Sequence, residues 1–331
     1  MVPAGEVGLL VVGVLALWIG ARLLVTGAAR LAGAAGVSAL IVGLTVVAFG
    51  TSAPEIVVST EAALEGRGSI SVGNVVGSNL FNLAVSLGLV ATFSPFRVSE
   101  TLVRRDALAM AFSTGIATVV LANGIVSRLD GGILLVILGC YLGALGVAIR
   151  NADGADDAGT QSPEAATTVA TASVPSDGDD GRNAKFGPET VRVLVGLVLV
   201  IGGGRVLVDA AVGLALAVGI SEWVVGATIV AAGTSLPELV TSIVAARGGD
   251  VSIAAGNVIG SNVFNALGVL GIAAVIQPLT VDPAVFLGLA WLAVVTAFAT
   301  VVLATGRTLT RLEGVALIAL GAGYWVVSVV V

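Results

Sequence analysis

Two copies of a Gly-Thr-Ser-x-Pro-Glu motif place a carboxylate in each half of the chain, within segments that are otherwise apolar. The first copy ends at Glu55 and the second ends at Glu238. Each glutamate lies near the middle of a predicted membrane span, where a charge costs about 2.5–3.5 kcal/mol and faces the protein interior or a cavity. The pair therefore indicates a functional site. The alternative is a pair of buried, protonated and hydrogen-bonded glutamic acids.

The residues before each glutamate supply further oxygen atoms. Proline lacks an N–H and its ring clashes with the carbonyl four residues back, so Pro54 frees the main-chain oxygen of Gly50. Freed backbone at membrane depth is tolerated where it lines a cavity. On the helical face of each acid lie an alanine, a threonine and a serine: Ala48, Thr51 and Ser52 in the first half, and Ala231, Thr234 and Ser235 in the second.

The next apolar segment of each half carries a second polar stripe with a four-residue repeat. Its members are Asn74, Ser78 and Asn82 in the first half, and Asn257, Ser261 and Asn265 in the second. Carboxylate, hydroxyl and carbonyl oxygens are the ligands that Ca²⁺ prefers. Na⁺ shares this preference and has a similar radius. Competition of both ions for one set of ligands is a physical basis for exchange.

Composition places these motifs in a membrane. The chain has 331 residues, of which 57% are apolar and 11% are charged, whereas a soluble domain is about 25% charged. It has no histidine and a single cysteine, Cys140, which excludes His-based zinc sites, Cys–His catalysis and disulfide frameworks. A net charge of −6 without a basic tract argues against nucleic-acid binding. We expect no cofactor and no obligate protein partner.

The two halves of the chain are copies of each other. Residues 43–88 align without a gap to residues 226–271 at an offset of 183, with 26 identities in 46 columns. An internal repeat of this kind indicates repeated structural units. Each half contains five apolar segments. These predict helices over 5–32, 37–64, 69–93, 104–122 and 130–149, and over 188–210, 220–246, 250–276, 284–305 and 312–330.

Because five is odd, the second half must enter the membrane from the opposite side. We therefore predict an all-α membrane protein with ten transmembrane helices, arranged as two inverted five-helix repeats over 1–150 and 188–331. Residues 151–187 are rich in small and acidic residues, which predicts a disordered linker. Twelve of the 15 basic residues fall on the linker side. The positive-inside rule then predicts a multi-pass cell-membrane protein with a cytoplasmic linker and both termini outside.

The doubled motif, followed each time by Gly-Asn-Val-x-Gly-Ser-Asn-x-Phe-Asn, resembles the paired repeats of the sodium/calcium exchanger family. This family, here of prokaryotic type, belongs to the cation/calcium antiporter superfamily, and the resemblance covers both halves. It implies a secondary-active antiporter rather than an enzyme. The transporter would exchange Na⁺ for Ca²⁺ by alternating access and normally export Ca²⁺, with these two ions and the lipid bilayer as its partners.

The resemblance also implies which residues bind the ions. In the family, the two motif glutamates bind Ca²⁺, and the threonine and serine before each of them bind Na⁺ and Ca²⁺. The serine of Gly-Ser-Asn and the alanine carbonyl bind Na⁺, and the residue four after that serine completes the centre. The implied set is Glu55, Glu238, Thr51, Thr234, Ser52, Ser235, Ser78, Ser261, Ala48, Ala231, Asn82 and Asn265.

One position departs from part of the family, and two other functions stay open. Asn265 stands where archaeal prototypes and the potassium-dependent branch carry aspartate, which argues against potassium co-transport. A first alternative keeps the fold but uses H⁺ as the driving ion, with protonation of the glutamates in place of Na⁺ binding. A second, more remote alternative is an intramembrane hydrolase that uses Glu55 and Glu238 as an acid–base pair.

Overall fold

The structure is a computed structural model that describes residues 4–35, 37, 39–97, 100, 102–156, 186–217, 231–281, 283, 285–306 and 308–330. These residues are almost entirely helical, as expected for apolar segments that must satisfy their backbone hydrogen bonds internally in lipid. By length and composition, six of the described helices can cross a membrane. The number is seven if the bent pair Leu40–Thr51 and Ala53–Leu64 counts as one span. The chain is a multi-pass membrane protein.

In the first repeat, the described residues form five successive helical segments, and three of these contain a π-helical turn (labelled η). The segments are α1 (Ala4–Ala35); α2 (Ala39–Val42), η1 (Gly43–Val47), α3 (Ala48–Thr51) and α4 (Ala53–Leu64); α5 (Gly68–Phe81), η2 (Asn82–Leu87) and α6 (Gly88–Phe93); η3 (Leu102–Ala107) and α7 (Leu108–Leu121); and α8 (Arg128–Asp156).

The described residues of the second repeat also form five segments, in the same order. They are α9 (Phe186–Ala217); α11 (Ala231–Thr234) and α12 (Leu236–Arg247); α13 (Val251–Val263), η6 (Phe264–Val269) and α14 (Leu270–Ile276); α15 (Val285–Gly306); and α16 (Arg311–Val330). The start of the predicted helix 220–246 lies outside the described residues.

Several helices extend beyond the boundaries predicted from hydropathy. Helix α8 continues to Asp156, seven residues past the predicted end and six residues into the segment predicted as linker. Helix α9 begins at Phe186 and ends at Ala217, whereas 188–210 was predicted. Hydropathy marks the part of a helix that lies in lipid, and a helix can continue into water beyond it. The rest of the predicted linker, 157–185, lies outside the described residues.

Four two-residue strands, which the sequence did not predict, join the two repeats. Strand β1 (Phe96–Arg97) pairs antiparallel with β4 (Thr308–Leu309), and β2 (Ile125–Val126) pairs antiparallel with β3 (Leu279–Thr280). The repeat offset of 183 carries β1 onto β3 and β2 onto β4. It also carries the Phe96–Leu309 pair onto the Leu279–Val126 pair. The two ribbons are therefore copies of one another.

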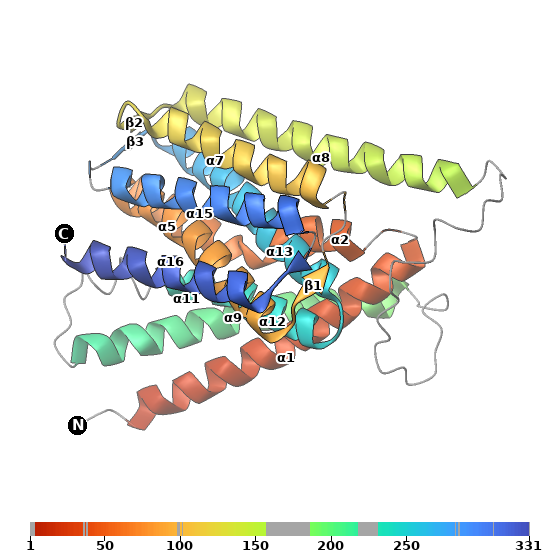
Figure 1. The fold of residues 1–331 in the computed structure, drawn as a ribbon. Helices are drawn as coiled ribbons and strands as arrows, with labels where there is room; N and C mark the ends of the chain where they lie inside the picture. Colours follow the sequence, from red (N-terminus) through yellow and green to blue (C-terminus); the bar gives the residue numbers. More distant parts are fainter. Residues whose placement is uncertain are drawn as a thin grey trace.

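The placement of the chain ends agrees with an inverted repeat. Figure 1 shows the N- and C-termini at one end of the helix bundle and the last residues of α8 at the other end. The two ribbons also lie at opposite ends, with β2 and β3 near the termini and β1 at the far end. Each repeat thus runs through the bundle in the direction opposite to the other.

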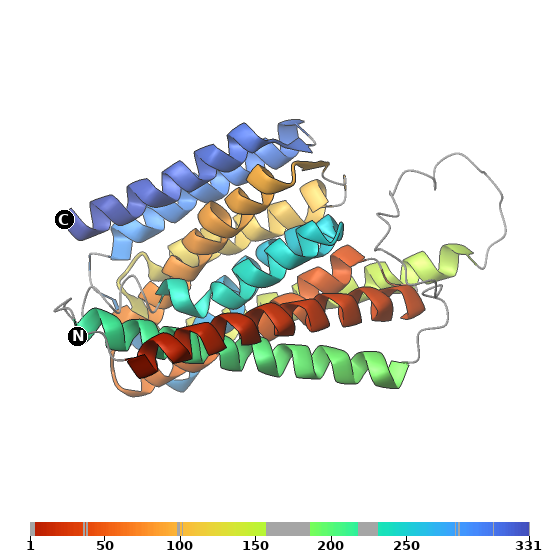
Figure 2. The same cartoon turned by 90° about the horizontal axis from the view of Figure 1, so that it is seen from below.

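Helices α1 and α9 pack against each other along one face of the bundle (Figure 2). Glycines permit this contact, because a Cβ on Gly20 would lie 2.8 Å from the carbonyl oxygen of Gly196. The offset carries Gly20 onto Gly203, where a Cβ would lie 3.0 Å from the carbonyl oxygen of Gly13. The two outer helices therefore pack backbone to backbone, at related positions.

The core of the bundle consists of the spans that carry the polar stripes. The span of α5 and α6 and the span of α13 and α14 are mostly buried, whereas α8 and α16 are mostly exposed on their outer faces. A Cβ on Gly256 would lie 2.7 Å from the carbonyl oxygen of Leu40, and one on Gly260 would lie 2.7 Å from that of Leu44. Small residues thus let α13 approach the first broken helix closely.

Candidate functional site

Both motif glutamates follow a break in a helix. Ser52 separates α3 from α4 with a ψ of 6°, and Ser235 separates α11 from α12 with a ψ of 3°. An α-helix has a ψ near about −42°. Pro54 and Pro237 occupy the first positions of the helices that follow, where proline is tolerated. The breaks thus place each glutamate in the first turn of a helix, at its positive end.

The two serines at the breaks contact the glutamates of the opposite repeat. Ser52 Oγ donates to Glu238 Oε1 at 3.0 Å, and Ser235 Oγ donates to Glu55 Oε1 at 3.1 Å. All four side chains are fully buried or nearly so. The repeat offset carries one contact onto the other. The structure thus brings together, at one centre, two acids that are 183 residues apart.

The second oxygen of each glutamate has no hydrogen-bond partner among the described residues. Oε2 of Glu55 and Oε2 of Glu238 are both buried and accept no hydrogen bond. The ion pairs of the described residues include neither acid. Buried carboxylates without a cation are costly, because removal of the charge from water is not compensated. The centre therefore presents two carboxylate oxygens that the described part of the chain does not compensate.

Two asparagines from the π-helical turns also lack partners. Asn82 begins η2, and Asn265 is the second residue of η6. Both side chains are fully buried, and all four of their amide nitrogen and oxygen atoms are without a hydrogen-bond partner. A π-helical turn within an α-helix is a frequent feature of functional sites. The predicted central pair is therefore polar and buried, and its amides have no hydrogen-bond partner in the part of the chain that the structure describes.

The predicted hydroxyl and carbonyl residues lie in two related networks. Ser261 Oγ donates to the carbonyl oxygen of Ala48 at 3.5 Å, and Thr51 Oγ1 lies 3.3 Å from the same oxygen. In the other network, the hydroxyls of Ser78 and Thr234 are 3.4 Å apart. Ala231 is the first residue of α11. The striped helix of each repeat thus contacts the broken helix of the other through these predicted oxygens.

Asn74 and Asn257 belong to the predicted polar stripe but not to the predicted ligand set. Asn257 accepts a hydrogen bond from Thr51 at 3.1 Å, and Asn74 accepts one from Thr234 at 3.2 Å. The only sequence signal for them is their position, four residues before each stripe serine. Their contacts join residues 206 and 160 positions apart, so the sequence offered no direct indication of this role.

The described residues contain no group of three or more His, Cys, Asp and Glu side chains that could hold a metal ion. A cation at the centre would therefore depend on two carboxylates together with neutral oxygens. Such a ligand set suits a hard cation and disfavours transition metals, which prefer imidazole or thiolate.

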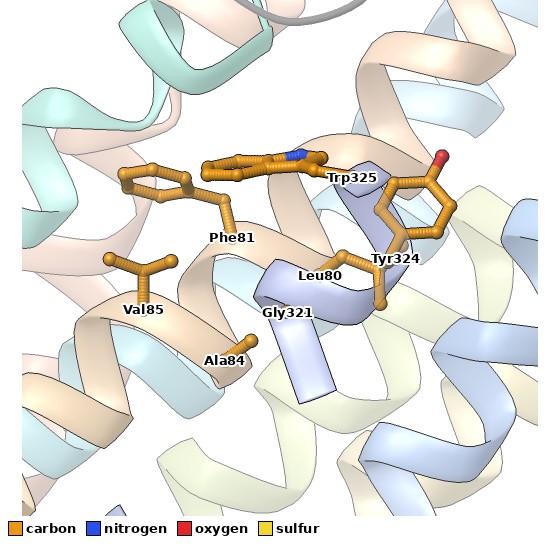
Figure 3. A pocket seen from close by; sticks show the side chains of 7 residues that line it. All are labelled: Leu80, Phe81, Ala84, Val85, Gly321, Tyr324 and Trp325. Carbon is orange, nitrogen blue, oxygen red and sulfur yellow. The ribbon is translucent and has the colours of Figure 1, made fainter. Parts of the chain in front are cut away.

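An apolar pocket lies outside this centre, between α5, η2 and α16 (Figure 3). Phe81 and Trp325 form its aromatic wall, with ring centroids 5.9 Å apart. Leu80, Ala84 and Val85 line it from the striped helix. Because this lining has almost no polar surface, the pocket does not suit an ion.

An inverted-repeat membrane bundle with paired acids and hydroxyls at its centre defines an ion transporter of the secondary-active class. The family model for the sodium/calcium exchanger protein matches residues 5–147 and again residues 189–330, once in each repeat. The chain therefore belongs to the sodium/calcium exchanger family. This family consists of transporters, so the hydrolase alternative is set aside.

Relatives in other organisms agree with this assignment. The chain is 38% identical to inner membrane protein YrbG of Escherichia coli over 277 residues, which cover 83% of this chain and 81% of that protein. It is 29% identical to the sodium/calcium exchanger MaX1 of Methanosarcina acetivorans, over 96% of this chain and 97% of that protein.

The fold matches that of a solved exchanger. The sodium-calcium exchanger NCX_Mj, in a crystal soaked with 10 mM Na⁺ and no Ca²⁺, superimposes with a TM-score of 0.78 at 30% identity. The match covers 96% of each chain. The all-helical fold with two repeats is therefore the fold of this exchanger.

Proposed function

We propose that this protein exchanges Na⁺ for Ca²⁺ across the cell membrane and normally exports Ca²⁺. The observation that carries the proposal is the crossed serine–glutamate pair. It leaves Oε2 of Glu55 and Oε2 of Glu238 buried, without a partner and without a basic residue in ion-pair contact among the described residues. A cation is the group that would compensate them. The names of MaX1 and NCX_Mj as sodium/calcium exchangers support the choice of ions.

The transported ions would share the predicted ligand set. Ca²⁺ takes six to eight oxygens, and two carboxylates balance its charge. Na⁺ carries one charge and relies more on neutral hydroxyl and carbonyl oxygens. In this proposal both ions use the centre formed by Glu55, Glu238, Thr51, Thr234, Ser52, Ser235, Ser78, Ser261, Asn82, Asn265, Ala48 and Ala231.

Exchange follows from competition at this centre. Both ions would use the same two carboxylates and the same neutral oxygens. Ca²⁺ and several Na⁺ therefore cannot be bound at the centre at the same time. Access must then alternate between the two sides of the membrane, as in other inverted-repeat transporters with a site near the midplane. A proton could replace Na⁺ in this scheme, but it would need only the carboxylates and would give no role to the surrounding hydroxyls.

The proposed orientation in the membrane follows from the distribution of basic residues. We place both termini outside and the predicted linker 151–187 in the cytoplasm, because 12 of the 15 basic residues then lie on the cytoplasmic side. The start of α1 and the end of α16 lie at one end of the bundle (Figure 1), which supports the placement of both termini on the same side of the membrane.

Flux through reconstituted protein tests the proposal. Purified protein in Na⁺-loaded liposomes is diluted into Na⁺-free buffer, and the uptake of radioactive Ca²⁺ is followed. We expect uptake that requires internal Na⁺ and that stops when the Na⁺ gradient is collapsed. Matched liposomes are loaded with K⁺, or carry only a pH gradient. Uptake that is driven by the pH gradient alone would replace Na⁺ with H⁺, and an absence of uptake from folded protein would overturn the Ca²⁺ assignment.

A further inference from the structure

We propose that Asn257 and Asn74 are positioning residues, which orient the hydroxyls of Thr51 and Thr234 so that their lone pairs face the transported Na⁺. This inference rests on the proposed function, because it concerns how the centre binds Na⁺. It adds two residues that do not touch the ion in this scheme. Both asparagines are buried, and each accepts a hydrogen bond from one of the two threonines.

The orientation of the Asn257 amide follows from its acceptors. Its Nδ2 lies 3.2 Å from the main-chain carbonyl of Glu238 and 3.0 Å from Ser242 Oγ. A carbonyl oxygen can only accept, so the nitrogen must be on that side of the amide. The oxygen Oδ1 then faces Thr51 at 3.1 Å. Because this oxygen cannot donate, the Thr51 hydroxyl gives its proton in this contact. The Ala48 carbonyl, at 3.3 Å, is the longer of the two acceptors within reach of that hydroxyl.

The related asparagine is oriented by the related acceptors, because the offset of 183 carries Ser59 onto Ser242 and Glu55 onto Glu238. Ser59 Oγ donates to the main-chain carbonyl of Ser71 at 3.3 Å, so it accepts from Nδ2 of Asn74 at 3.0 Å. Asn74 Nδ2 also lies 3.5 Å from the carbonyl oxygen of Glu55. Its Oδ1 therefore faces Thr234 and accepts the proton of that hydroxyl at 3.2 Å. The same polarity arises independently in both repeats.

The direction of the hydroxyl proton decides whether a threonine can bind a cation. A hydroxyl has one donor and two acceptor lone pairs. A proton that pointed into the centre would repel the ion, whereas a proton held by the asparagine leaves the lone pairs free to face it. The asparagines thus fix in advance an orientation that Na⁺ would otherwise have to impose on binding, and preorganisation of this kind increases affinity.

Each asparagine also connects the two repeats. Asn257 belongs to the second repeat, and it joins the Thr51 hydroxyl of the first repeat to the main chain at Glu238. Asn74 makes the reverse connection from Thr234 to Glu55. Each asparagine therefore links a threonine hydroxyl of one repeat, a predicted Na⁺ ligand, to the main-chain carbonyl of the glutamate of the other repeat.

Na⁺ should depend on this arrangement more than Ca²⁺ does. Ca²⁺ has twice the charge and gains most from the two carboxylates, which the asparagine side chains do not orient directly. Na⁺ draws a larger part of its binding free energy from neutral oxygens. Loss of the asparagine should therefore weaken the binding of Na⁺ more than the binding of Ca²⁺.

A double-mutant cycle tests the inference. The four proteins are wild type, Thr51→Val, Asn257→Ala and the double variant, each assayed by Ca²⁺ flux and by equilibrium Ca²⁺ binding without Na⁺. We expect Asn257→Ala to raise the Na⁺ half-saturation constant about tenfold, and the Ca²⁺ dissociation constant about threefold or less. In a Thr51→Val background, Asn257→Ala should cause little further change, because the hydroxyl that it orients is gone.

Ser242→Ala is the matched control, since it removes another partner of the Asn257 amide but leaves the contact to Thr51. Its Na⁺ half-saturation constant should stay near that of wild type. Equal loss for Na⁺ and Ca²⁺ in Asn257→Ala, or additive effects in the cycle, would overturn the inference and leave the asparagine a packing role. If the wild type shows no Na⁺-dependent flux, it is the proposed function that fails.

The related pair keeps the test decisive if Asn257→Ala does not fold. Asn74→Ala and Thr234→Val form a second cycle on the other repeat. Ser59→Ala is the matched control, because the Glu55 carbonyl still orients the Asn74 amide in that variant. The same coupling between asparagine and threonine is expected there. A folded Asn74→Ala protein with a Na⁺ half-saturation constant within twofold of wild type would contradict the inference.

Discussion

At the centre of the molecule, related residues of the two repeats make related contacts, with Ser52 and Ser235 each bonded to the opposite glutamate at 3.0 and 3.1 Å. The start of the fourth span is different. Arg105 donates there to Asp106 at 2.7 and 3.2 Å within η3. The repeat offset carries these residues onto Gly288 and Leu289, which have no charge.

The ends of α1 and α9 show the same divergence. Arg30 and Arg192 both form ion pairs with Glu189. The offset relates the two arginines to Gly213 and Leu9. Charged contacts outside the centre thus differ between the repeats, whereas the polar contacts inside it are kept. We infer that function constrains the centre in both repeats, and that stability can be provided differently in each.

The largest expected effect comes from breaking the centre itself. Glu55→Gln and Glu238→Gln each remove one of the two carboxylates that would balance Ca²⁺. We expect each variant to lose Ca²⁺ transport by about 100-fold or more, and by similar factors, because opposite charges at close range contribute several kcal/mol in a buried site. Initial rates of Ca²⁺ uptake in liposomes measure this. Glu61→Gln, on the exposed face of α4, is the control.

Similar losses in the two variants would support equal roles for the repeats. If one variant transports Ca²⁺ at the wild-type rate while the other is inactive, the two glutamates do not act as a pair. The inference that function constrains the centre equally in both repeats would then be wrong.

A smaller effect is expected at the ion pair that only the first repeat possesses. Arg105→Gln leaves Asp106 fully buried without its charged partner. We expect a loss of about 3 kcal/mol in stability, seen as a lower thermal midpoint in detergent, with ion half-saturation constants within about twofold of wild type. Arg67→Gln is the matched control, because its pair with Glu65 is exposed and contributes about 1 kcal/mol or less.

A large change in Na⁺ or Ca²⁺ affinity in Arg105→Gln would show that this part of the first repeat belongs to transport. The inference that charged contacts outside the centre serve stability alone would then be wrong.

The smallest effect is expected at Asp250, between α12 and α13, where the first repeat has Arg67. Partial burial raises the pKa of Asp250 above the ordinary aspartate value of about 3.9. The native state then binds more protons than the unfolded state between the two pKa values, so stability falls as pH rises through that window. Asp250→Asn should raise the thermal midpoint slightly at pH 7.

The same substitution should change nothing below about pH 3, where the aspartate is protonated in both states. Thermal unfolding at the two pH values measures the difference. A lower midpoint for Asp250→Asn at pH 7 would mean that the charged carboxylate stabilises this helix start, contrary to the sign derived from its burial.

Much of the centre could be predicted from the sequence, because its chemistry is local and duplicated. Pro54 and Pro237 indicated freed main-chain oxygens just before each glutamate, and the offset of 183 indicated that both acids have the same surroundings. The breaks at Ser52 and Ser235 were not predicted, because they lie within the predicted helices 37–64 and 220–246. The four-residue spacing of Asn74, Ser78 and Asn82 placed them on one helical face. The roles of the predicted ligands in ion binding stay predictions.

Features that depend on contacts between distant segments could not be predicted. The ribbons join Phe96 to Leu309 and Val126 to Leu279, and two residues carry too little strand signal to be recognised. The π-helical turns at Asn82 and Asn265 depend on packing rather than on local propensity. The Thr51–Asn257 contact joins residues 206 positions apart, so its geometry emerges only when the repeats pack together.

The central claim is that one buried centre, completed by both repeats, binds Ca²⁺ and Na⁺ in competition. Equilibrium binding of radioactive Ca²⁺ to the purified protein, at increasing Na⁺, tests it most directly. We expect saturable Ca²⁺ binding that Na⁺ displaces completely and more steeply than a single competing ion would, and that Glu55→Gln and Glu238→Gln both abolish. Ca²⁺ binding that persists at saturating Na⁺, or that survives in either variant, would contradict the account.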